Sequence, residues 1–539
     1  MRLIIKDYLL QLKEKDELDF LICDLLRQKG YIIDSIPKSG NRQYGVDIKA
    51  HNRDEVLLFV VKQGNIDRKV WDTEQNAVRQ SINEIFDTYL INLSFSEKKK
   101  KIQIIVATNG FMDENVVINW NGYVNSQSKY HEQSILINFW SIDEITKQVQ
   151  EFLFNEYLLP SDVQSDLRKA LYFIEERNYK PIYYERAVDY YFLQMTNVLT
   201  EETAVSSRNA RLKKYLSSLF LATQMIVQYA HTKKHYKIGI NVNEYLMIRF
   251  WKFLLDHKLL GKENYSMWLV RFCKEYEKSN DLYYNTIKEF CENKVLFPRY
   301  GEIIEQRLMI YEILGYLSSY AYYKLCYYGN SYTIGIVNTI VLLLTLNPEY
   351  QYPPFDSNIC QLSMLFRLLS GLGREDESKA LLSNLCIILP PYYRIFHKYP
   401  TSEDSYLDAI NIEKGNEHDG YKSSGLWGYF LLWIYLFDDE ETYMSLIEFL
   451  TKDIEKVTKC VWFMRKEEET LFYNYFAMNL SGDGVAIRVN EKYEDFRKQI
   501  GFIVEQYKNE HFSYEEYSFL PLELIVCRYY GYVPRVIRE

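Results

Sequence analysis

The chain has 539 residues, of which 47% are hydrophobic and 25% charged, so it is neither a disordered polymer nor a collagen-like repeat. It carries 64 Lys and Arg against 73 Asp and Glu, a net charge of -9, which excludes bulk electrostatic attraction to nucleic acid. Tyrosine is abundant (49 residues), while Pro (12) and Gly (22) are scarce. That composition favours long helices over a turn-rich β protein.

The eight cysteines are scattered and include no Cys-x-x-Cys pair, which is typical of a reduced intracellular chain. The most apolar run, 334–346, is too short to span a bilayer, and residues 1–12 lack the features of a signal peptide. We therefore expect a soluble, cytoplasmic protein with no membrane partner.

Helical and strand patterns alternate as far as residue 160. Strands are predicted over 31–37, 44–50, 56–62, 101–110 and 134–141. Helices are predicted over 14–29, 72–93 and 142–157. The residues between the last two strands read as irregular. The order α-β-β-β-α-β-irregular-β-α predicts a helix-flanked mixed sheet of the α+β class.

Beyond residue 160 almost every segment reads as an amphipathic helix joined to the next by a short polar connector. We predict two domains, 1–160 with the sheet and 161–539 as an all-α helical array. Proline-rich segments at 348–356 and 390–404 suggest sub-boundaries near residues 350 and 400. The helical domain is expected to serve sensing or assembly, through a protein partner or self-association.

Two charged residues stand out in neighbouring predicted strands. Asp47 lies between Val46 and Ile48 within 44–50, and Lys62 ends the apolar strand 56–62. Partly buried charges cost several kcal/mol unless they are paired or bind a metal. An Asp47–Lys62 salt bridge at the sheet end is one interpretation, and a catalytic site is the other.

The surrounding residues favour the catalytic interpretation. Segments 17–31 (ELDFLICDLLRQKGY), 42–50 (RQYGVDIKA) and 57–64 (LLFVVKQG) together resemble the PD-(D/E)xK nuclease superfamily, particularly its Mrr-like restriction endonuclease branch. The resemblance implies that Asp47 binds metal, that Lys62 is the active-site lysine, and that Glu17 is the helix glutamate and a second metal ligand. The implied metal is Mg²⁺, with Mn²⁺ able to substitute.

One position departs from the family pattern. Val60 stands where the family has Glu or Gln, and strand alternation puts it on the same face as Lys62, so we expect it to point at the site without binding metal. Mg²⁺ would then be held by Asp47, Glu17, the Val61 carbonyl and water, with Lys62 activating the attacking water. The alternative is a catalytically inactive nuclease fold that serves as a nucleic-acid- or protein-binding scaffold.

Further polar residues near this pattern are candidates for auxiliary roles. Gln63 and Gln75 are the predicted auxiliary side chains. Lys and Arg contact phosphate groups without reading sequence. The predicted nucleic-acid-binding residues are Arg42, Arg68, Lys69 and Arg79. For the lysine run 98–101, a solvated turn is favoured over a phosphate patch.

The resemblance implies DNA as the substrate and leaves RNA open. Nuclease domains of this kind joined to long helical regions are similar to effectors of bacterial antiviral defence, an inference from analogy alone. The sequence contains no Walker A, kinase, Ser-His-Asp or zinc-finger pattern. We therefore expect no nucleotide-driven motor within this chain.

Overall fold

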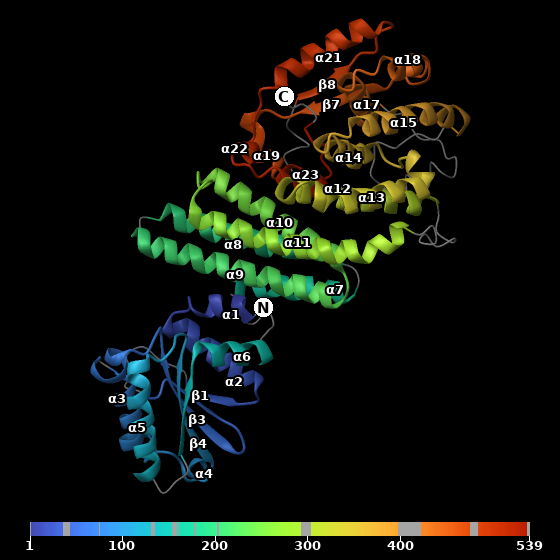
Figure 1. Cartoon of the computed structure of the whole chain (residues 1–539). Coiled ribbons are helices and arrows are strands. Elements are labelled where there is room, and N and C mark those ends of the chain that lie inside the picture. Colours follow the sequence, from blue (N-terminus) through green and yellow to red (C-terminus); the bar gives the residue numbers. More distant parts are fainter. Residues whose placement is uncertain are drawn as a thin grey trace. The chain divides into compact units, whose positions relative to one another are not determined.

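The computed structural model describes residues 2–35, 44–74, 76–130, 135–152, 159, 161–176, 179–201, 204–292, 303–396, 422–474 and 483–535. The chain divides into two compact units, Met1–Lys234 and His235–Glu539. The first runs from blue to green in Figure 1 and the second from green to red. The helices between residue 161 and Lys234 thus group with the sheet, whereas the sequence suggested a boundary near residue 160.

The first unit contains the predicted mixed sheet, with strand order β1-β2-β3-β4-β5. The strands are β1 (Ile32–Ser35), β2 (Ile48–His51), β3 (Glu55–Lys62), β4 (Lys101–Thr108) and β5 (Ile135–Trp140). The first three strands pair antiparallel and the last three parallel. The apolar β3 and β4 lie at the centre, where both faces of the sheet are covered.

Helices cover both faces of this sheet. Figure 1 shows α3 (Val78–Glu84) and α5 (Glu114–Tyr130) on one side, and α2 (Asp19–Gln28) and α6 (Ile142–Phe152) on the other. The core under α3 and α5 is formed by Val46, Val56, Leu58, Val60, Ile66, Trp71, Val78, Ile82, Ile85, Leu93, Ile102, Ile104, Val106, Val116 and Trp120. The segment predicted as irregular is therefore largely the helix α5.

Two predicted helices are interrupted by π-type turns, which close i→i+5 bonds and shift the helical phase. The helix predicted over 14–29 begins with η1 (Glu14–Leu18) before α2. The helix predicted over 72–93 consists of η2 (Lys69–Thr73), α3 and η3 (Ile85–Tyr89). A short α4 (Phe95–Lys98), with a capping box from Ser94, leads into β4.

Four further helices complete the first unit: α1 (Arg2–Leu9), α7 (Ser161–Glu175), α8 (Pro181–Thr200) and α9 (Val205–Thr232). Tyrosine hydroxyls join α8 to α9, through Tyr184–Thr223 at 2.9 Å and Tyr191–Ser218 at 2.7 Å. Both pairs are buried, so these tyrosines pack between helices, with their polar ends satisfied inside the unit.

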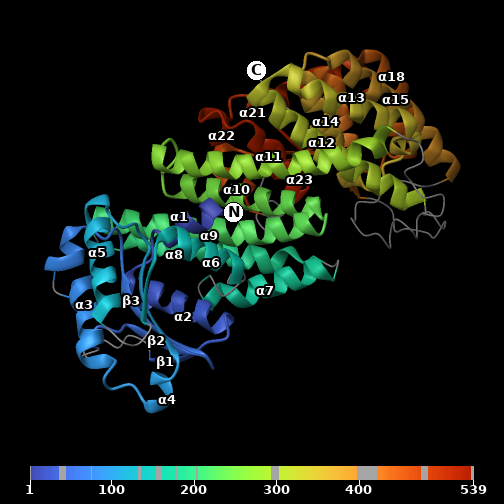
Figure 2. The same ribbon diagram turned by 60° about the horizontal axis from the view of Figure 1, so that its bottom comes forward.

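The second unit is largely helical. Its helices are α10 (Tyr236–Asp256), α11 (Glu263–Glu292), α12 (Ile303–Tyr328), α13 (Asn330–Leu346), α14 (Ile359–Gly371), α15 (Glu375–Phe396), α17 (Gly425–Leu436), α18 (Glu440–Glu448), α19 (Glu469–Phe472), α21 (Tyr493–Tyr507), α22 (Ser513–Glu516) and α23 (Pro521–Tyr530). Helices α12 and α13 lie side by side, as do α14 and α15 (Figure 1 and Figure 2). Across the described residues, no helix is both long and apolar enough to cross a membrane.

The region is largely helical as predicted, and it also contains a small sheet. Strands β6 (Ser423–Ser424), β7 (Thr458–Phe463) and β8 (Asp483–Ile487) form a three-stranded sheet in that order. The β-branched and aromatic residues of β7 alternate between buried and exposed positions, the period of a half-covered strand. The segment is short and lies between two strongly helical stretches, so its strand period does not stand out in the sequence.

Candidate active site

The approach to β2 is fixed by a glycine. Gly45 has φ +81°, and a Cβ at this position would lie 2.1 Å from the Ser81 carbonyl oxygen on α3. Only glycine allows this backbone approach. The glycine of the G-x-D pattern therefore lets α3 press against the turn, and this contact fixes the position of Asp47 two residues later.

Asp47 directly precedes β2, whereas the sequence suggested a place inside the strand. Its backbone N–H donates to the Phe59 carbonyl at 2.8 Å. Its side chain accepts a hydrogen bond at Oδ2 from the Val61 backbone N–H at 2.7 Å. Backbone and side chain together continue the ladder between β2 and β3, so the carboxylate is held at the end of the sheet beside the last residues of β3.

The environment of this carboxylate is electrostatically unusual. Burial raises the pKa of Asp47 from 3.8 to about 6, against the lowering effects of the Val61 N–H and the Lys62 ammonium. The charges of Glu14, which raises this pKa, and Lys15, which lowers it, also reach the group. A carboxyl with a pKa near neutrality beside a lysine is typical of functional sites, although structural charge networks also perturb pKa values.

These charges are close enough to interact, yet they are not paired. Asp47 and Lys62 are both described, and no ion pair joins them, so the structure does not form the salt bridge considered above. Among the described residues, no side chain forms an ion pair with Glu14 or Lys15 either. Oδ1 of Asp47 receives no hydrogen bond from the described part of the chain. The group retains unused donors and acceptors.

Glu17 is not brought to this group. Its Oε2 accepts a hydrogen bond from the Lys13 backbone N–H at 2.8 Å, and its Oε1 pairs with Lys214 on α9. The carboxylate that interacts with Asp47 is instead Glu14, at the first position of η1. Glu17 is the residue that the family resemblance indicates, and no signal in the sequence distinguishes Glu14 as the acidic residue near Asp47.

Val60 lies in the core and does not line an open site. Its side chain is fully buried and belongs to the apolar cluster with Val46 and Trp71, under α3 and α5. The expectation that it would point at the site is therefore corrected. Lys62, two residues further on the same face, is half-buried because the strand ends there.

Asn109 connects the segments that carry these charges. Its side chain is 1% exposed, and its Oδ1 accepts from the Gly64 N–H at 2.7 Å. Its Nδ2 donates to the carbonyls of Leu9 at 2.9 Å and Leu12 at 2.8 Å. One buried amide therefore joins the end of β4, the loop after Lys62 and the chain that leads into Glu14.

The remaining predicted site residues are either exposed or outside the described residues. Gln63, Arg68 and Lys69 are exposed after β3. Arg79 is exposed too, contacting Asp72 at 3.3 Å and lying 5.8 Å from the ring centre of Tyr123. Arg42 and Gln75 lie outside the described residues. Three basic candidates thus follow Lys62 in the chain with their side chains accessible to solvent.

The lysine run 98–101 lies at the other end of the sheet. In the parallel pairing of β3 with β4, Lys101 is opposite Glu55, while Lys62 is opposite Thr108. At the rise of a strand, this separation is about 23 Å. Lys98 and Lys100 donate to backbone carbonyls at 2.6 Å and 2.7 Å. The run is therefore too far from Asp47 to contribute to the same site.

The donor atoms at the site are compatible with Mg²⁺. The described residues contain no group of three or more His, Cys, Asp or Glu side chains placed to hold a metal ion. Mg²⁺ needs fewer, because it keeps several waters and is commonly bound through one or two carboxylates. Asp47, with Oδ1 uncommitted, and Glu14 supply carboxylates of this kind.

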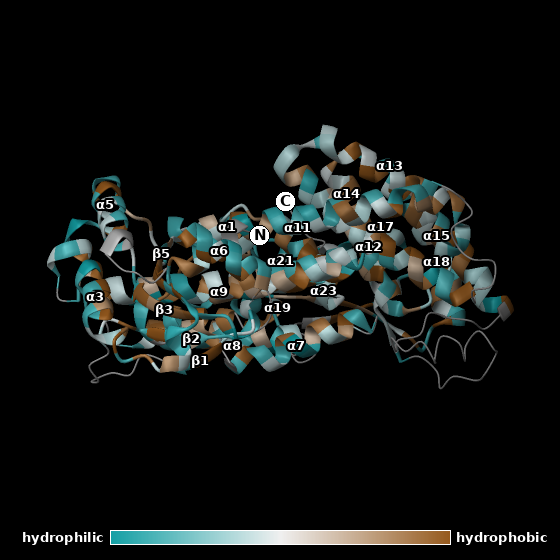
Figure 3. Ribbon diagram, turned by 90° about the horizontal axis from the view of Figure 1, so that it is seen from below, coloured by the Kyte–Doolittle hydropathy of each residue, from teal (hydrophilic) through white to brown (hydrophobic). Residues whose placement is uncertain are grey.

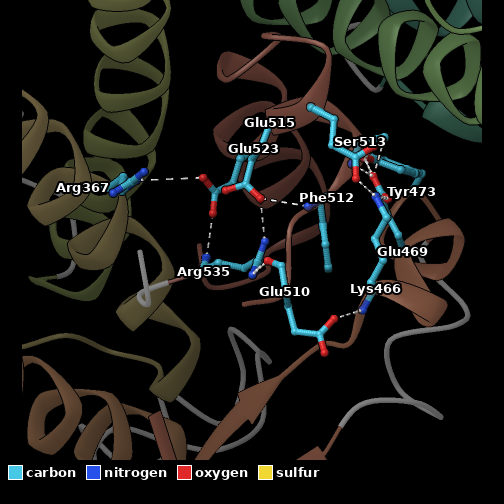
Figure 4. Close-up of polar contacts among 11 residues, drawn as sticks. Arg367, Lys466, Glu469, Tyr473, Glu510, Phe512, Ser513, Glu515, Glu523 and Arg535 are labelled. Carbon is cyan, nitrogen blue, oxygen red and sulfur yellow. Dashed lines mark hydrogen bonds and ion pairs between the residues drawn. The ribbon is translucent and has the colours of Figure 1, made fainter. Parts of the chain in front are cut away.

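A second polar cluster, in the second unit, has a different character. Figure 4 shows Glu469 and Glu523 among the side chains that surround them. Glu469 is 2% exposed and accepts from the Ser513 N–H and the Tyr473 hydroxyl, both at 2.7 Å. It also pairs with Lys466 at 2.8 Å. These carboxylate oxygens are engaged by the protein, as expected of a structural network.

No protein-family model, curated protein or solved structure matches the chain. The functional assignment therefore depends on the residues around Asp47 and Lys62 and on the sequence pattern that contains them.

Proposed function

We propose that the first unit is a Mg²⁺-dependent nuclease that hydrolyses phosphodiester bonds, with DNA as the favoured substrate. The observation that carries the proposal is the half-buried carboxylate of Asp47, held at the sheet end within the electrostatic reach of Lys62, with neither side chain in an ion pair. Keeping two opposite charges close but unpaired costs stability, and a site that must accept a metal and a phosphate group accounts for that cost.

Each charged residue has a role in this proposal. Asp47 and Glu14 would hold the metal, and Lys62 would donate to a phosphate oxygen or orient the attacking water. When bound, Mg²⁺ supplies Lewis-acid polarisation of the phosphate and lowers the pKa of its water. Arg68, Lys69 and Arg79 would contact the nucleic-acid backbone, because their exposed side chains follow Lys62 in the chain. Such local contacts suit a chain whose net charge is -9.

The wider role is proposed by analogy. A nuclease unit followed by a large helical region matches the organisation expected of a bacterial defence effector, in which the helical part senses a trigger or binds a partner. The helical region would then control when the nuclease acts. The cleavage chemistry can be tested without knowledge of that trigger.

The test compares plasmid cleavage by the natural chain and by Asp47→Ala and Lys62→Ala, in Mg²⁺ and in Mn²⁺. Each substitution is expected to remove metal-dependent cleavage. Asp24→Ala and Lys169→Ala are matched controls, since both side chains are exposed in the first unit and neither residue is assigned to the site. A second readout is thermal stability, because Mg²⁺ should stabilise the natural chain but not Asp47→Ala. Cleavage that survives both site substitutions would refute the assignment.

A second function, a non-cleaving scaffold, is favoured by one observation. Val60 occupies the family's usual Glu or Gln position and is fully buried in the apolar core. Such a protein would bind DNA in Ca²⁺ in a gel-shift assay but would not cleave it in Mg²⁺ or Mn²⁺, even with a cognate partner added. Loss of that binding in an Arg68→Ala/Lys69→Ala double variant would place the nucleic acid on the same face as in the nuclease proposal.

A further inference from the structure

Helix α13 of the second unit is strongly apolar although it is only partly buried. Its 17 residues, NSYTIGIVNTIVLLLTL, include no charged side chain. One face is buried in the unit through Thr333, Ile336, Val337, Thr339, Ile340 and Leu343. The brown segments of α13 in Figure 3 mark its hydrophobic residues. The lack of charge would be ordinary for a buried helix, but α13 also has an exposed face.

That exposed face is a stripe of uncharged residues along the helix. Ile334 is 48% exposed, Val341 39% and Leu342 40%. The stripe consists of Ser331, Ile334, Gly335, Asn338, Val341, Leu342 and Thr345. Exposed apolar side chains gathered on one face of a helix are a feature of interaction sites. By contrast, the exposed positions on α21 include Glu494, Asp495, Arg497 and Lys498.

We propose that α13 is a self-association surface, on which α13 of a second copy of this chain docks antiparallel about a two-fold axis through Asn338. This inference goes beyond the proposed nuclease activity and does not depend on it. Two-fold contacts are the commonest form of self-association, and they require a surface that is complementary to itself. The stripe meets that requirement in its residue order.

The stripe is self-complementary because its residues fall into matched pairs at equal distances from Asn338. In the antiparallel arrangement, Ile334 faces Leu342 of the second copy, and Gly335 faces Val341 of the second copy. The pair outside these is Ser331 with Thr345. The first pair joins two apolar side chains, the second places a glycine beside a branched side chain, and the third joins two hydroxyl groups. At the centre, the two Asn338 amides can bond to each other, and a central Asn pair of this type fixes helix register.

Charge favours a second copy over a charged partner. The chain carries -9, so two copies repel each other over most of their surface, and α13 offers a face without charge on which they can meet. A charged partner face would lose its hydration against this stripe and find no counter-charge there. If the partner surface is the same uncharged stripe of a second copy, no buried charge is left without a partner.

Sedimentation velocity of the full chain over a concentration series tests the proposal. We expect a reversible dimer at twice the chain mass. Ile334→Lys or Leu342→Glu should each weaken it by at least about a hundredfold, because either buries an unpaired charge. The double variant Ile334→Lys/Leu342→Glu should restore it, because each new charge then meets its opposite across the axis. Within one helix these positions lie about 12 Å apart, too far to pair.

Two further variants separate docking from folding. Gly335→Ala should weaken the dimer without lowering thermal stability, since the added Cβ meets only the Tyr284 hydroxyl at 3.7 Å and alanine favours helix. Phe502→Lys, at a 70% exposed position on α21, should leave the dimer unchanged. A single-chain mass at every concentration overturns the proposal. So does a dimer insensitive to the single charge variants, and failure of the double variant to restore it overturns the antiparallel register.

Discussion

Buried carboxylates have charged or hydrogen-bonding partners in the second unit but remain largely unpaired in the first. In the second unit, Glu469 and Glu523 are 2% and 0% exposed, and partners from neighbouring segments engage them (Figure 4). In the first unit, Asp47 is within the electrostatic reach of Lys62 and of the like-charged Glu14, yet no ion pair joins Asp47 to Lys62. Paired charges inside a protein hold a structure together, whereas charges left unpaired at the end of a sheet lower stability and remain available for chemistry.

This difference between Glu523 and Asp47 arises from the segments that supply their hydrogen-bond and ion-pair partners. Glu523 on α23 accepts the Arg535 N–H at 2.8 Å and lies 3.9 Å from the Arg367 guanidinium on α14, so it joins segments distant in the chain. Asp47 receives its one hydrogen bond from Val61, on the strand next to it. Both carboxylate oxygens of Glu523 have partners, whereas the single hydrogen bond to Asp47 fixes the orientation of its carboxylate. Substitutions in the two regions should therefore have opposite effects on stability.

The largest stability effect is expected in the second unit. Glu523→Ala leaves the Arg367 guanidinium and the Arg535 N–H without their buried partner, and should destabilise that unit by about 3 to 5 kcal/mol. Chemical denaturation measures the loss. Glu505→Ala, at an exposed position on α21, should change the unfolding free energy by less than about 0.5 kcal/mol. Equal effects of both substitutions would mean that the network contributes nothing beyond surface charge.

In the first unit, Asp47→Asn should increase stability while removing activity. The folded-state pKa of Asp47, about 6, lies above its ordinary value of 3.8, so the folded protein prefers the protonated carboxyl. That contribution is complete below pH 4 and is lost as pH rises through 6. In EDTA at pH 8, the asparagine variant should therefore be more stable than the natural chain by about 1 to 3 kcal/mol.

Denaturation midpoints measured from pH 4 to pH 8 check this sign. The two proteins should converge at pH 4 and diverge above pH 6, and Asp24→Asn, at an exposed position, should follow the natural chain throughout. If Asp47→Asn is less stable at pH 8, the carboxylate has a compensating partner and the contrast between the two units fails.

The buried amide that connects the site segments should show an intermediate effect. Asn109→Ala leaves the Gly64 N–H and two carbonyls unpaired, which should cost about 1 to 3 kcal/mol. Because the same amide positions the loop after Lys62 and the chain before Glu14, Mg²⁺-induced thermal stabilisation should fall as well. Asn92→Ala is the matched control, since that side chain is exposed and donates only to the Thr88 carbonyl. An unchanged response to Mg²⁺ would limit Asn109 to a structural role.

Much of the first unit's fold could be predicted from the sequence. The apolar runs of β3 and β4 indicate covered central strands, and Asp47 and Lys62 stand out because charge interrupts or ends such runs. Helix α5 was missed because its asparagines and serines obscure the apolar period that Val116 and Trp120 follow. Patterns with a local cause are visible in the sequence, and weakly amphipathic elements are not.

Long-range contacts set the limit of prediction at the site. Glu17 pairs with Lys214, which lies almost 200 positions along the chain, and no spacing rule indicates such a contact. The triple contact of Asn109 likewise depends on where α1 packs. Strand alternation placed Val60 on the correct face but did not reveal that the core extends that far along β3. Tertiary packing, not local pattern, decided these residues.

The smallest stability effect is expected for Glu17, and it separates the two acidic residues of η1. Glu17→Gln weakens a partly exposed ion pair with Lys214, which is worth about 0.2 to 1 kcal/mol. It should affect metal-dependent cleavage far less than Glu14→Gln, which removes a carboxylate that the proposed function assigns to the metal and should lower cleavage by about 10- to 100-fold. Plasmid cleavage by the two variants, at Mg²⁺ concentrations from micromolar to millimolar, gives the comparison. A larger loss in Glu17→Gln would mean that η1 rearranges when metal binds, so that the family's helix glutamate reaches the site after leaving Lys214.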